Sequence, residues 1–239
     1  MQRWMKSKLL VSFLVCGFLV AAMLSVEMKN PMKTYAAGKN RKIAIGSIVT
    51  FGNYEQDKDP EDGSEPLEWV VLDQKEDCVL LLSRYVIDCK RYHRANIDIT
   101  WENCDLRDWL NHEFFRTAFS EKQQEQIMET DVKNSDNKQY DIYGGNDTYD
   151  RVFLLSLEEV GKYTGSDQER EAIATKYAQE QGVWSDDEDE TADWWLRSPG
   201  VHSDVAVYVY DYGGVWGRGL SHVPSDPVGV RPALWVKLD

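Results

Sequence analysis

The sequence predicts an α+β fold, with short antiparallel strands at both ends of the domain and two or more helices in the middle. Three observations indicate this arrangement. Short β-rich runs bounded by turn residues occupy the stretch from residue 45 to residue 82. Apolar side chains recur with helical spacing from Asp105 onward. After Trp194 the chain is again rich in β-branched and aromatic residues, which favour strands.

Residues 1–37 are predicted to be a signal peptide or an N-terminal membrane anchor. Arg3, Lys6 and Lys8 precede residues 9–26, which carry no charged side chain. A basic segment followed by an apolar one is typical of a secretory signal, and this one is also nearly long enough to span a bilayer. We expect cleavage near Ala36 or Ala37, with anchoring as the alternative. Both outcomes predict an extracytoplasmic protein, either secreted or held at the cell surface.

The chain is strongly acidic, with a formal net charge of −14. Residues 1–37 contain five basic side chains and one acidic one, so the net charge of the remainder is −18. Such a charge repels phosphates and anionic headgroups. We therefore expect no nucleic-acid partner, and membrane contact only through an uncleaved N-terminal segment. Oligomeric state cannot be inferred from these features.

The first β region follows a basic linker, residues 38–44, and opens a single domain predicted over residues 45–239. A short strand is expected at residues 45–52 and an acidic loop at residues 57–66. Residues 67–72 and 78–82 then predict a hairpin. Its period of two places Trp69 and Val71 on one face.

Helices are expected in the middle of the chain. From Asp105, Leu106, Trp109, Leu110 and Phe114 share one side of a helix. Ser120 with Gln123 and Ser156 with Glu159 have the spacing of capping boxes, which start helices. Residues 168–181 have further helical character, whereas residues 133–150 are polar and predict a long surface excursion.

The last third of the chain predicts strands again. They are expected at residues 152–155, 194–197, 205–210 and 228–238, with a turn at Gly213 and Gly214. Of the four cysteines, Cys16 lies in the apolar N-terminal segment. Because an oxidising compartment favours pairing, we predict a Cys89–Cys104 disulfide and leave Cys78 as a buried free thiol.

Several short motifs, in this order and spacing, resemble those of the domain of unknown function DUF6273, found in extracellular proteins of Firmicutes bacteria. The resemblance covers residues 45–238 and rests on residues 46–52, 68–72, 100–102, 106–111, 118–120, 152–156, 194–200 and 229–235. More distantly, the Trp-Trp-Leu-Arg-Ser stretch and the closing Gly-Val-Arg-Pro strand are similar to the C-type lectin-like scaffold, which formylglycine-generating enzymes share. The calcium-binding motifs of those lectins and the late cysteine pair of those enzymes are absent from the sequence.

Aromatic residues near the end of the chain form the candidate ligand site. Rings that cover apolar faces and an arginine fork suit a groove for a saccharide or a peptide. The predicted ligand-binding residues are Trp194, Trp195, Arg197, Tyr208, Tyr210 and Trp216. The alternative interpretation places one ring of the Trp194 and Trp195 pair in the core and the other at a rim. Arg197 and Arg231 would each then pair with a buried carboxylate such as Asp105 or Asp108.

The sequence thus predicts a non-enzymatic binding module for a glycan, a peptide or a wall component. One alternative is a hydrolase or oxidase that uses His202, Asp204 and Arg197, although no nucleophile motif or metal-ligand spacing accompanies them. A purely structural or assembly domain is the other. The acidic runs at residues 57–62 and 186–190 are interpreted as solvated loops, so we expect no metal and no cofactor.

Overall fold

The computed structural model describes residues 42–59, 61–219, 221–222 and 228–238. The predicted signal or anchor, residues 1–37, with its candidate cleavage sites at Ala36 and Ala37, lies outside these residues. Within the described part of the chain, no helix combines the length and the apolar character needed to cross a membrane.

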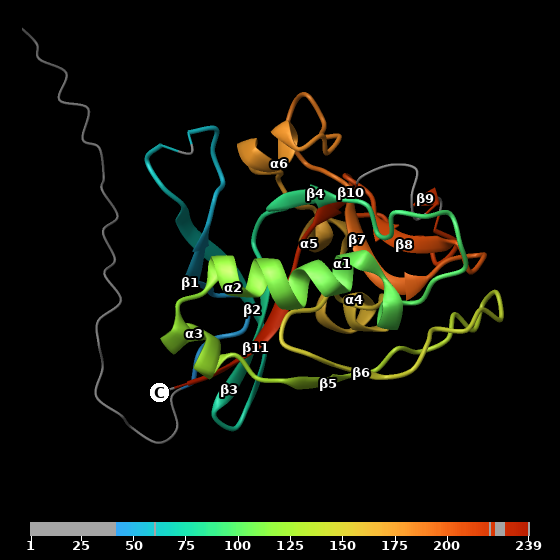
Figure 1. The fold of residues 1–239 in the computed structure, drawn as a ribbon, viewed down its shortest axis with the longest axis horizontal. Helices are drawn as coiled ribbons and strands as arrows, with labels where there is room; N and C mark the ends of the chain where they lie inside the picture. The colour runs from blue at the N-terminus through green and yellow to red at the C-terminus, as the bar shows by residue number, and fades with distance from the viewer. Residues whose placement is uncertain (1–41, 60, 220, 223–227, 239) are drawn as a thin grey trace, which may run out of the picture. The chain divides into compact units, whose positions relative to one another are not determined.

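The first sheet contains four antiparallel strands in the order β1-β2-β3-β11 (Figure 1). Their bounds are β1 Ile48–Tyr54, β2 Glu65–Lys75, β3 Cys78–Ser83 and β11 Ala233–Lys237. The predicted hairpin is confirmed, because β2 and β3 pair on either side of Glu76 and Asp77. Trp69 and Val71 are both fully buried, as their shared face predicts. This sheet joins the beginning of the described chain to its last strand.

The second sheet has five strands in the order β4-β10-β7-β8-β9. They are β4 Asp88–Lys90, β7 Trp194–Pro199, β8 Val205–Val209, β9 Ser221–His222 and β10 Val228–Val230. All pairs are antiparallel except β10 with β7, which are parallel. A separate two-stranded sheet pairs β5 (Thr130–Val132) with β6 (Thr148–Asp150). The fold is therefore mixed, with several antiparallel sheets and short helices.

The two large sheets are connected by Arg231 and Pro232. The strand predicted at residues 228–238 divides here into β10 and β11, which belong to different sheets. Pro232 has no N–H to continue a ladder, while its carbonyl accepts a bond from the Ser83 N–H (2.8 Å). The guanidinium of Arg231 is buried and donates to the Ser83 carbonyl (2.9 Å). The break thus fixes the end of β3 against the start of β11.

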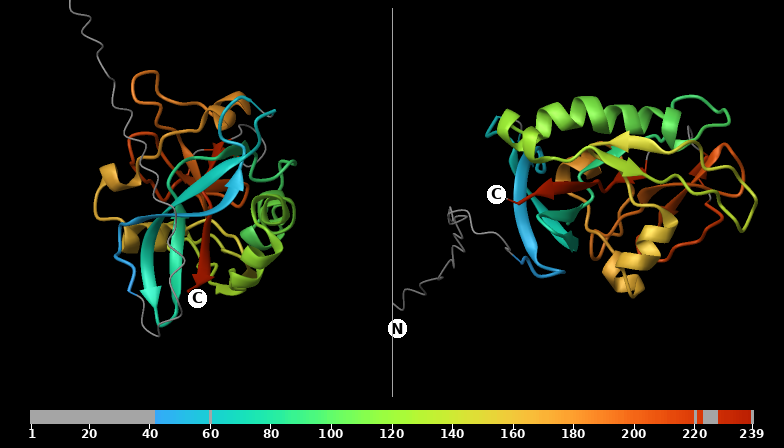
Figure 2. Two further views of the ribbon diagram at one scale, coloured as in Figure 1. Left: turned by 90° about the vertical axis from the view of Figure 1, so that its left-hand side faces the viewer. Right: turned by 90° about the horizontal axis from the view of Figure 1, so that it is seen from below.

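The helices are short, and the longest helical segment runs across both sheets. It consists of α1 (Asp105–Trp109), a π-helical turn (Leu110–Phe114) and α2 (Phe115–Ala118). As predicted, Leu106, Leu110 and Phe114 are buried. α2 contacts β1, and the short 3₁₀ helix before α1, Trp101–Asn103, contacts β7. The right-hand view of Figure 2 shows this segment side-on against the sheets.

Among the other helices, the predicted capping boxes are present, but one predicted helical region is divided in two. Both capping boxes are confirmed, at the start of α3 (Glu121–Gln126) and of α4 (Leu157–Tyr163). The single helix predicted at residues 168–181 is instead α5 (Asp167–Arg170) and α6 (Lys176–Glu180). Ile173 and Ala174 between them form bridges with Thr191 and Val86. These tertiary contacts outweigh the helical propensity of the segment.

The predicted strand at residues 152–155 and the predicted polar excursion at residues 133–150 are both partly wrong. Val152 to Leu155 are all buried but belong to no sheet, and only Phe153 forms a bridge, with Ala233. In the excursion, residues 148–150 form β6, and Asn137 is buried. Asn137 Nδ2 donates to the carbonyls of Pro199 (2.9 Å) and Gly217 (2.7 Å), which attaches this loop to the second sheet.

The three described cysteines are free, which corrects the predicted Cys89–Cys104 disulfide. Cys89 lies in β4, and Cys104 caps α1 by accepting a bond from the Arg107 N–H (3.4 Å). Burial raises the pKa of both thiols to about 12. Cys78 is free as predicted, but it is only half-buried. The spacing of the two cysteines in the sequence could not reveal that Cys89 is placed in a strand and Cys104 at a helix cap.

Candidate functional site

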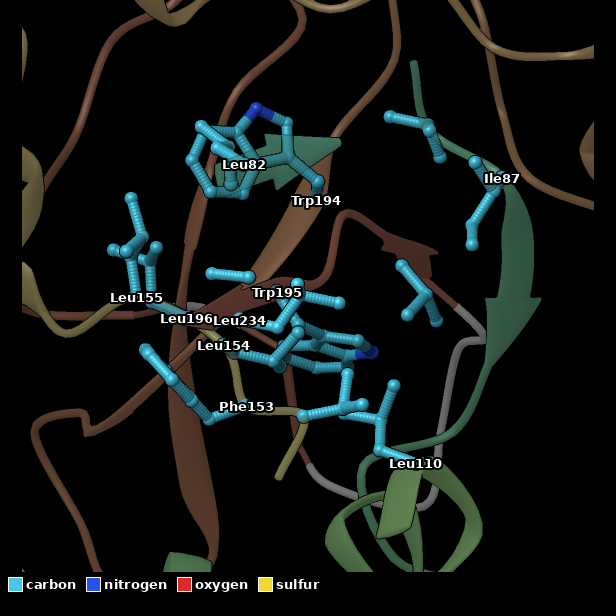
Figure 3. Packing of buried hydrophobic residues seen from close by; sticks show 14 of the residues in the cluster. Leu82, Ile87, Leu110, Phe153, Leu154, Leu155, Trp194, Trp195, Leu196 and Leu234 are labelled. Atoms are coloured by element: carbon cyan, nitrogen blue, oxygen red, sulfur yellow. The ribbon is translucent and has the colours of Figure 1, made fainter. Parts of the chain in front are cut away.

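Trp194 and Trp195 lie in the core, so neither ring can form a ligand surface. Both are fully buried, and Figure 3 shows their rings among aliphatic side chains that include Leu154, Leu155 and Leu234. Trp194 Nε1 donates to the Arg170 carbonyl (3.0 Å), and Trp195 Nε1 donates to the Lys90 carbonyl (2.8 Å). β7 has a neighbouring strand on each side and protein packed against both faces. Although successive side chains point to opposite faces of the sheet, both rings are therefore buried and neither lies at the edge of a surface groove. Both sequence-based interpretations of this pair are therefore corrected.

Arg197 is also structural. Its side chain is buried and pairs with Glu159 at the start of α4. It donates further to the carbonyls of Leu154 (2.6 Å) and Lys133 (3.0 Å). Arg197 thus has a carboxylate partner, as predicted, but the partner is the half-buried Glu159 rather than a buried carboxylate such as Asp105 or Asp108. Because the side chain is buried and both terminal nitrogens are bound to these groups, Arg197 does not offer its fork to a substrate.

Arg231 lacks the carboxylate that was predicted for it. Its partners among the described residues are the Ser83 and Arg170 carbonyls and the ring of Trp194, 4.9 Å from the guanidinium carbon. Burial without an opposite charge lowers the pKa of Arg231 to about 9. Asp105 instead pairs with Arg94 (3.0 Å), and Asp108 with His112 (3.0 Å).

A ladder of aromatic rings leads from the core to the surface beside β8. Tyr208 is buried and contacts Trp195 edge-on, with ring centroids 6.1 Å apart. Tyr210 follows at 4.7 Å from Tyr208, and Tyr212 stacks on Tyr210 at 5.4 Å. Of the predicted site residues, Tyr208 is therefore a core contact, and Tyr210 is half-buried.

Tyr212 and Trp216 form the exposed end of this ladder, which we call the aromatic platform. Their exposed fractions are 51% and 61%, and Trp216 Nε1 donates to the Tyr212 hydroxyl (3.2 Å). Trp216 was predicted as a site residue, whereas Tyr212 was not. The signal for Tyr212 is the Gly-Gly pair that follows it, because a Cβ on Gly214 would overlap the Tyr212 ring.

The turn that carries Tyr212 is held in place by contacts with α5. The Tyr210 N–H donates to the Gly214 carbonyl (2.9 Å), and Arg170 Nε donates to the Gly213 carbonyl (2.7 Å). Gly213 has a φ of +76°, and a Cβ there would collide with the Asp167 carbonyl. Only glycine combines this backbone angle with so close an approach.

A second turn fixes Trp216. The Gly219 N–H donates to the Trp216 carbonyl (3.0 Å), and the Val201 N–H donates to the Arg218 carbonyl (2.6 Å). Together with the bond from Asn137 to Gly217, these contacts hold the two turns that carry the platform rings. Preorganised rings lose little conformational entropy on binding.

Polar residues follow the platform in the chain or contact the turns that carry it. Gln139 approaches Gly217, and Arg218 is exposed. The Asp193 carboxylate accepts the Asp211 N–H (2.8 Å) beside Tyr212, and burial raises the pKa of Asp193 to about 6. Flat exposed rings suit the apolar faces of a saccharide, and polar side chains on the adjoining turns suit its hydroxyls.

The residues of the alternative hydrolase group differ in exposure. His202 is exposed, whereas Arg197 is buried and bound to protein groups. The acidic run at residues 186–190 forms a turn, in which Asp186 accepts the Glu188 N–H (2.7 Å) and Lys176 pairs with Glu190. In the other acidic region, carboxylate oxygens of Glu55, Asp57 and Glu65 lie within 4.8 Å of one another.

Comparison with known proteins gives one match. Residues 76–238 match the sequence model of a family described as Domain of unknown function (DUF6273). No curated protein and no solved structure matches the chain.

Proposed function

Since the chain belongs to the DUF6273 family, we propose that it is a non-enzymatic binding module that recognises a glycan through the aromatic platform. The observation that carries this proposal is that Tyr212 and Trp216 are exposed and yet joined by a hydrogen bond on two fixed turns. Exposed large aromatic residues held in this way mark interaction sites on soluble proteins. This proposal narrows the predicted ligand from a glycan, a peptide or a wall component to a glycan. It also moves the binding site from the groove expected between Trp194 and Trp216 to the aromatic platform.

The test is a glycan array combined with pull-down of isolated cell-wall material. We expect Trp216→Ala and Tyr212→Ala each to lower the affinity tenfold or more, about 1.4 kcal/mol. Trp184→Ala is the matched control, because Trp184 is 60% exposed and lies outside the platform. Equal binding by Trp216→Ala and Trp184→Ala would exclude the platform. Binding to wall peptides but not to glycans would retain the site and change its ligand, and no binding at all would favour a structural or assembly domain.

The proposal includes an extracytoplasmic location, either secreted or at the cell surface. The basic and apolar residues 1–26 support it. Cell fractionation and N-terminal sequencing of the mature protein test it. A new N-terminus after Ala36 or Ala37 indicates release, and an intact N-terminus in the membrane fraction indicates anchoring.

We also propose a C-type lectin-like scaffold. It is supported by the pairing of the Trp-Trp-Leu-Arg strand, β7, with the Gly-Val-Arg strand, β10, through Trp194 and Gly229. An experimental structure compared with known lectin-like domains would test the scaffold independently of the ligand. A different strand order would reject the scaffold and leave the platform intact.

A further inference from the structure

A second candidate site lies away from the aromatic platform, in a small cavity where β1, the helical segment 105–118 and α6 meet. The cavity has a volume of about 260 Å³. Its walls include four aromatic residues, Tyr54, Trp109, Phe114 and Tyr177, and two acidic ones, Glu55 and Glu113. These elements are labelled at the upper left and centre of Figure 1.

The aromatic walls are arranged as a connected set. Tyr54 meets Phe114 and Tyr177 edge-on, with centroids 5.2 Å and 5.8 Å apart. Trp109 lies 5.4 Å from Phe114. The faces of such rings attract cations, most strongly for tryptophan. Trp109 already shows this chemistry, because Lys90 Nζ lies 4.7 Å from its ring centroid.

The charge around the cavity is negative. Lys90 forms an ion pair with the buried carboxylate of Asp88 (3.1 Å), which offsets the positive charge beside Trp109. None of the described residues that line the cavity is basic. Glu55 belongs to the wall and also to the acidic trio with Asp57 and Glu65. Burial, and then the charges of Glu65 and Asp57, raise the pKa of Glu55, so a cation bound here would relieve repulsion.

Two enclosed polar atoms of the wall have no hydrogen-bond partner in the described structure. They are the acceptor Glu55 Oε1 and the donor Trp109 Nε1. A buried donor or acceptor without a partner costs free energy, so a ligand that forms hydrogen bonds with both atoms would bind favourably. An ammonium group satisfies the acceptor, and a carbonyl or hydroxyl oxygen on the same molecule satisfies the donor.

We propose that this cavity binds a small organic ammonium cation, held by cation–π contact with Tyr54, Trp109 and Tyr177 and by the carboxylate of Glu55. The volume lies just below the range of about 300–1,000 Å³ typical of sites for drug-sized ligands, which indicates a small occupant. A calcium ion takes 6–8 oxygen ligands, whereas four of the nine residues that line the cavity are aromatic. The walls therefore favour an alkylammonium group over a metal ion.

The experiment titrates the purified ¹⁵N-labelled protein with n-butylammonium chloride, n-butanol and calcium chloride. The tryptophan indole N–H signals are followed by NMR, and the Trp109 signal is assigned as the one missing from Trp109→Phe. We expect n-butylammonium to shift the Trp109 signal with saturation, and n-butanol to leave it unchanged because it carries no charge. Equal shifts with n-butanol would overturn the proposal.

A matched pair of charge variants tests the carboxylate. Glu55→Gln removes the charge from the wall, and Glu61→Gln removes one from the same connection between β1 and β2 but outside the cavity. We expect Glu55→Gln to weaken n-butylammonium binding about tenfold and Glu61→Gln to change it less than twofold. An unaltered spectrum of the remaining indoles shows that each variant is folded. Equal affinities of the two variants, or saturable binding of calcium without any of n-butylammonium, would reject the ammonium site.

Discussion

The buried tryptophan pair and the aromatic platform come from the same region of the sequence but have opposite roles. Trp194 and Trp195 are fully buried in β7, whereas Tyr212 and Trp216 are more than half exposed just beyond β8. The difference lies in position within the sheet, since β7 has partners on both sides and the platform lies on turns. The sequence therefore predicted the aromatic region, but whether a ring faces solvent depends on its position in the sheet or on a turn.

The largest expected effect separates the two sets by stability. Trp195→Ala removes a fully buried ring and a bond to Lys90, so we expect the free energy of unfolding to fall by about 3–5 kcal/mol. Trp216→Ala removes an exposed ring and should change it by no more than about 0.5 kcal/mol. Urea unfolding followed by circular dichroism measures both. Similar losses for the two variants would show that the platform is part of the core.

Gly213→Ala should have an intermediate effect, because it combines a positive φ with a collision against the Asp167 carbonyl. We expect a loss of about 1–3 kcal/mol, together with weaker glycan binding as the turn shifts. Gly182→Ala is the control, since Gly182 also has a positive φ, +100°, but has open space around it. The difference between the unfolding free energies of the two variants, measured in urea, gives the contribution of the close contact between Gly213 and Asp167 in α5. If they lose the same stability, the turn is not held by that approach.

Asp193 links the buried strand to the platform, and ionisation of its buried carboxylate should lower the stability of the fold. Burial raises its pKa to about 6 in the folded protein, above the value of about 3.9 in unfolded chains. The folded state then binds the proton more tightly, so the stability contributed by this group is lost as the pH rises through about 6. Calorimetry should show a higher Tm for Asp193→Asn than for the parent protein at pH 7.5, by a few degrees. At pH 4 the gain should be smaller, and a gain independent of pH would contradict the assignment.

The smallest effect is expected for Tyr212→Phe. It removes only the hydroxyl that accepts from Trp216 Nε1, so stability should change by less than about 0.5 kcal/mol. Glycan affinity should fall less than in Tyr212→Ala, because the ring remains. Titration calorimetry of both variants with one glycan identified on the array measures the two contributions. A loss as large as that of Tyr212→Ala would assign the binding to the hydroxyl rather than to the ring.

The features that the sequence predicted well depend on residues close together in the chain. The hairpin of β2 and β3 and the capping boxes at Ser120 and Ser156 are set by neighbouring residues, and all three are confirmed. The platform could be predicted only in part. Trp216 was identified from its type and the turn at Gly213 and Gly214 was predicted, but the close contact of that turn with Asp167 was not. Such contacts are invisible to local patterns.

The predictions that failed depend on contacts between distant segments. Arg197 pairs with Glu159 and Arg231 with backbone carbonyls, and neither choice follows from sequence distance. The break between β10 and β11 arises because the two halves of one apolar run join different sheets. The cavity at Trp109 and Glu55 was not anticipated either, since its walls come from four separate parts of the chain.

The position of β11 has a consequence for how the protein matures. Its partner β3 lies near the beginning of the fold, with Cys78 opposite Lys237. During synthesis, β3 therefore presents an unpaired edge until the final strand has emerged, and such edges promote aggregation. Pairings between segments far apart in sequence also slow folding. We expect the domain to reach its native state only after synthesis of β11.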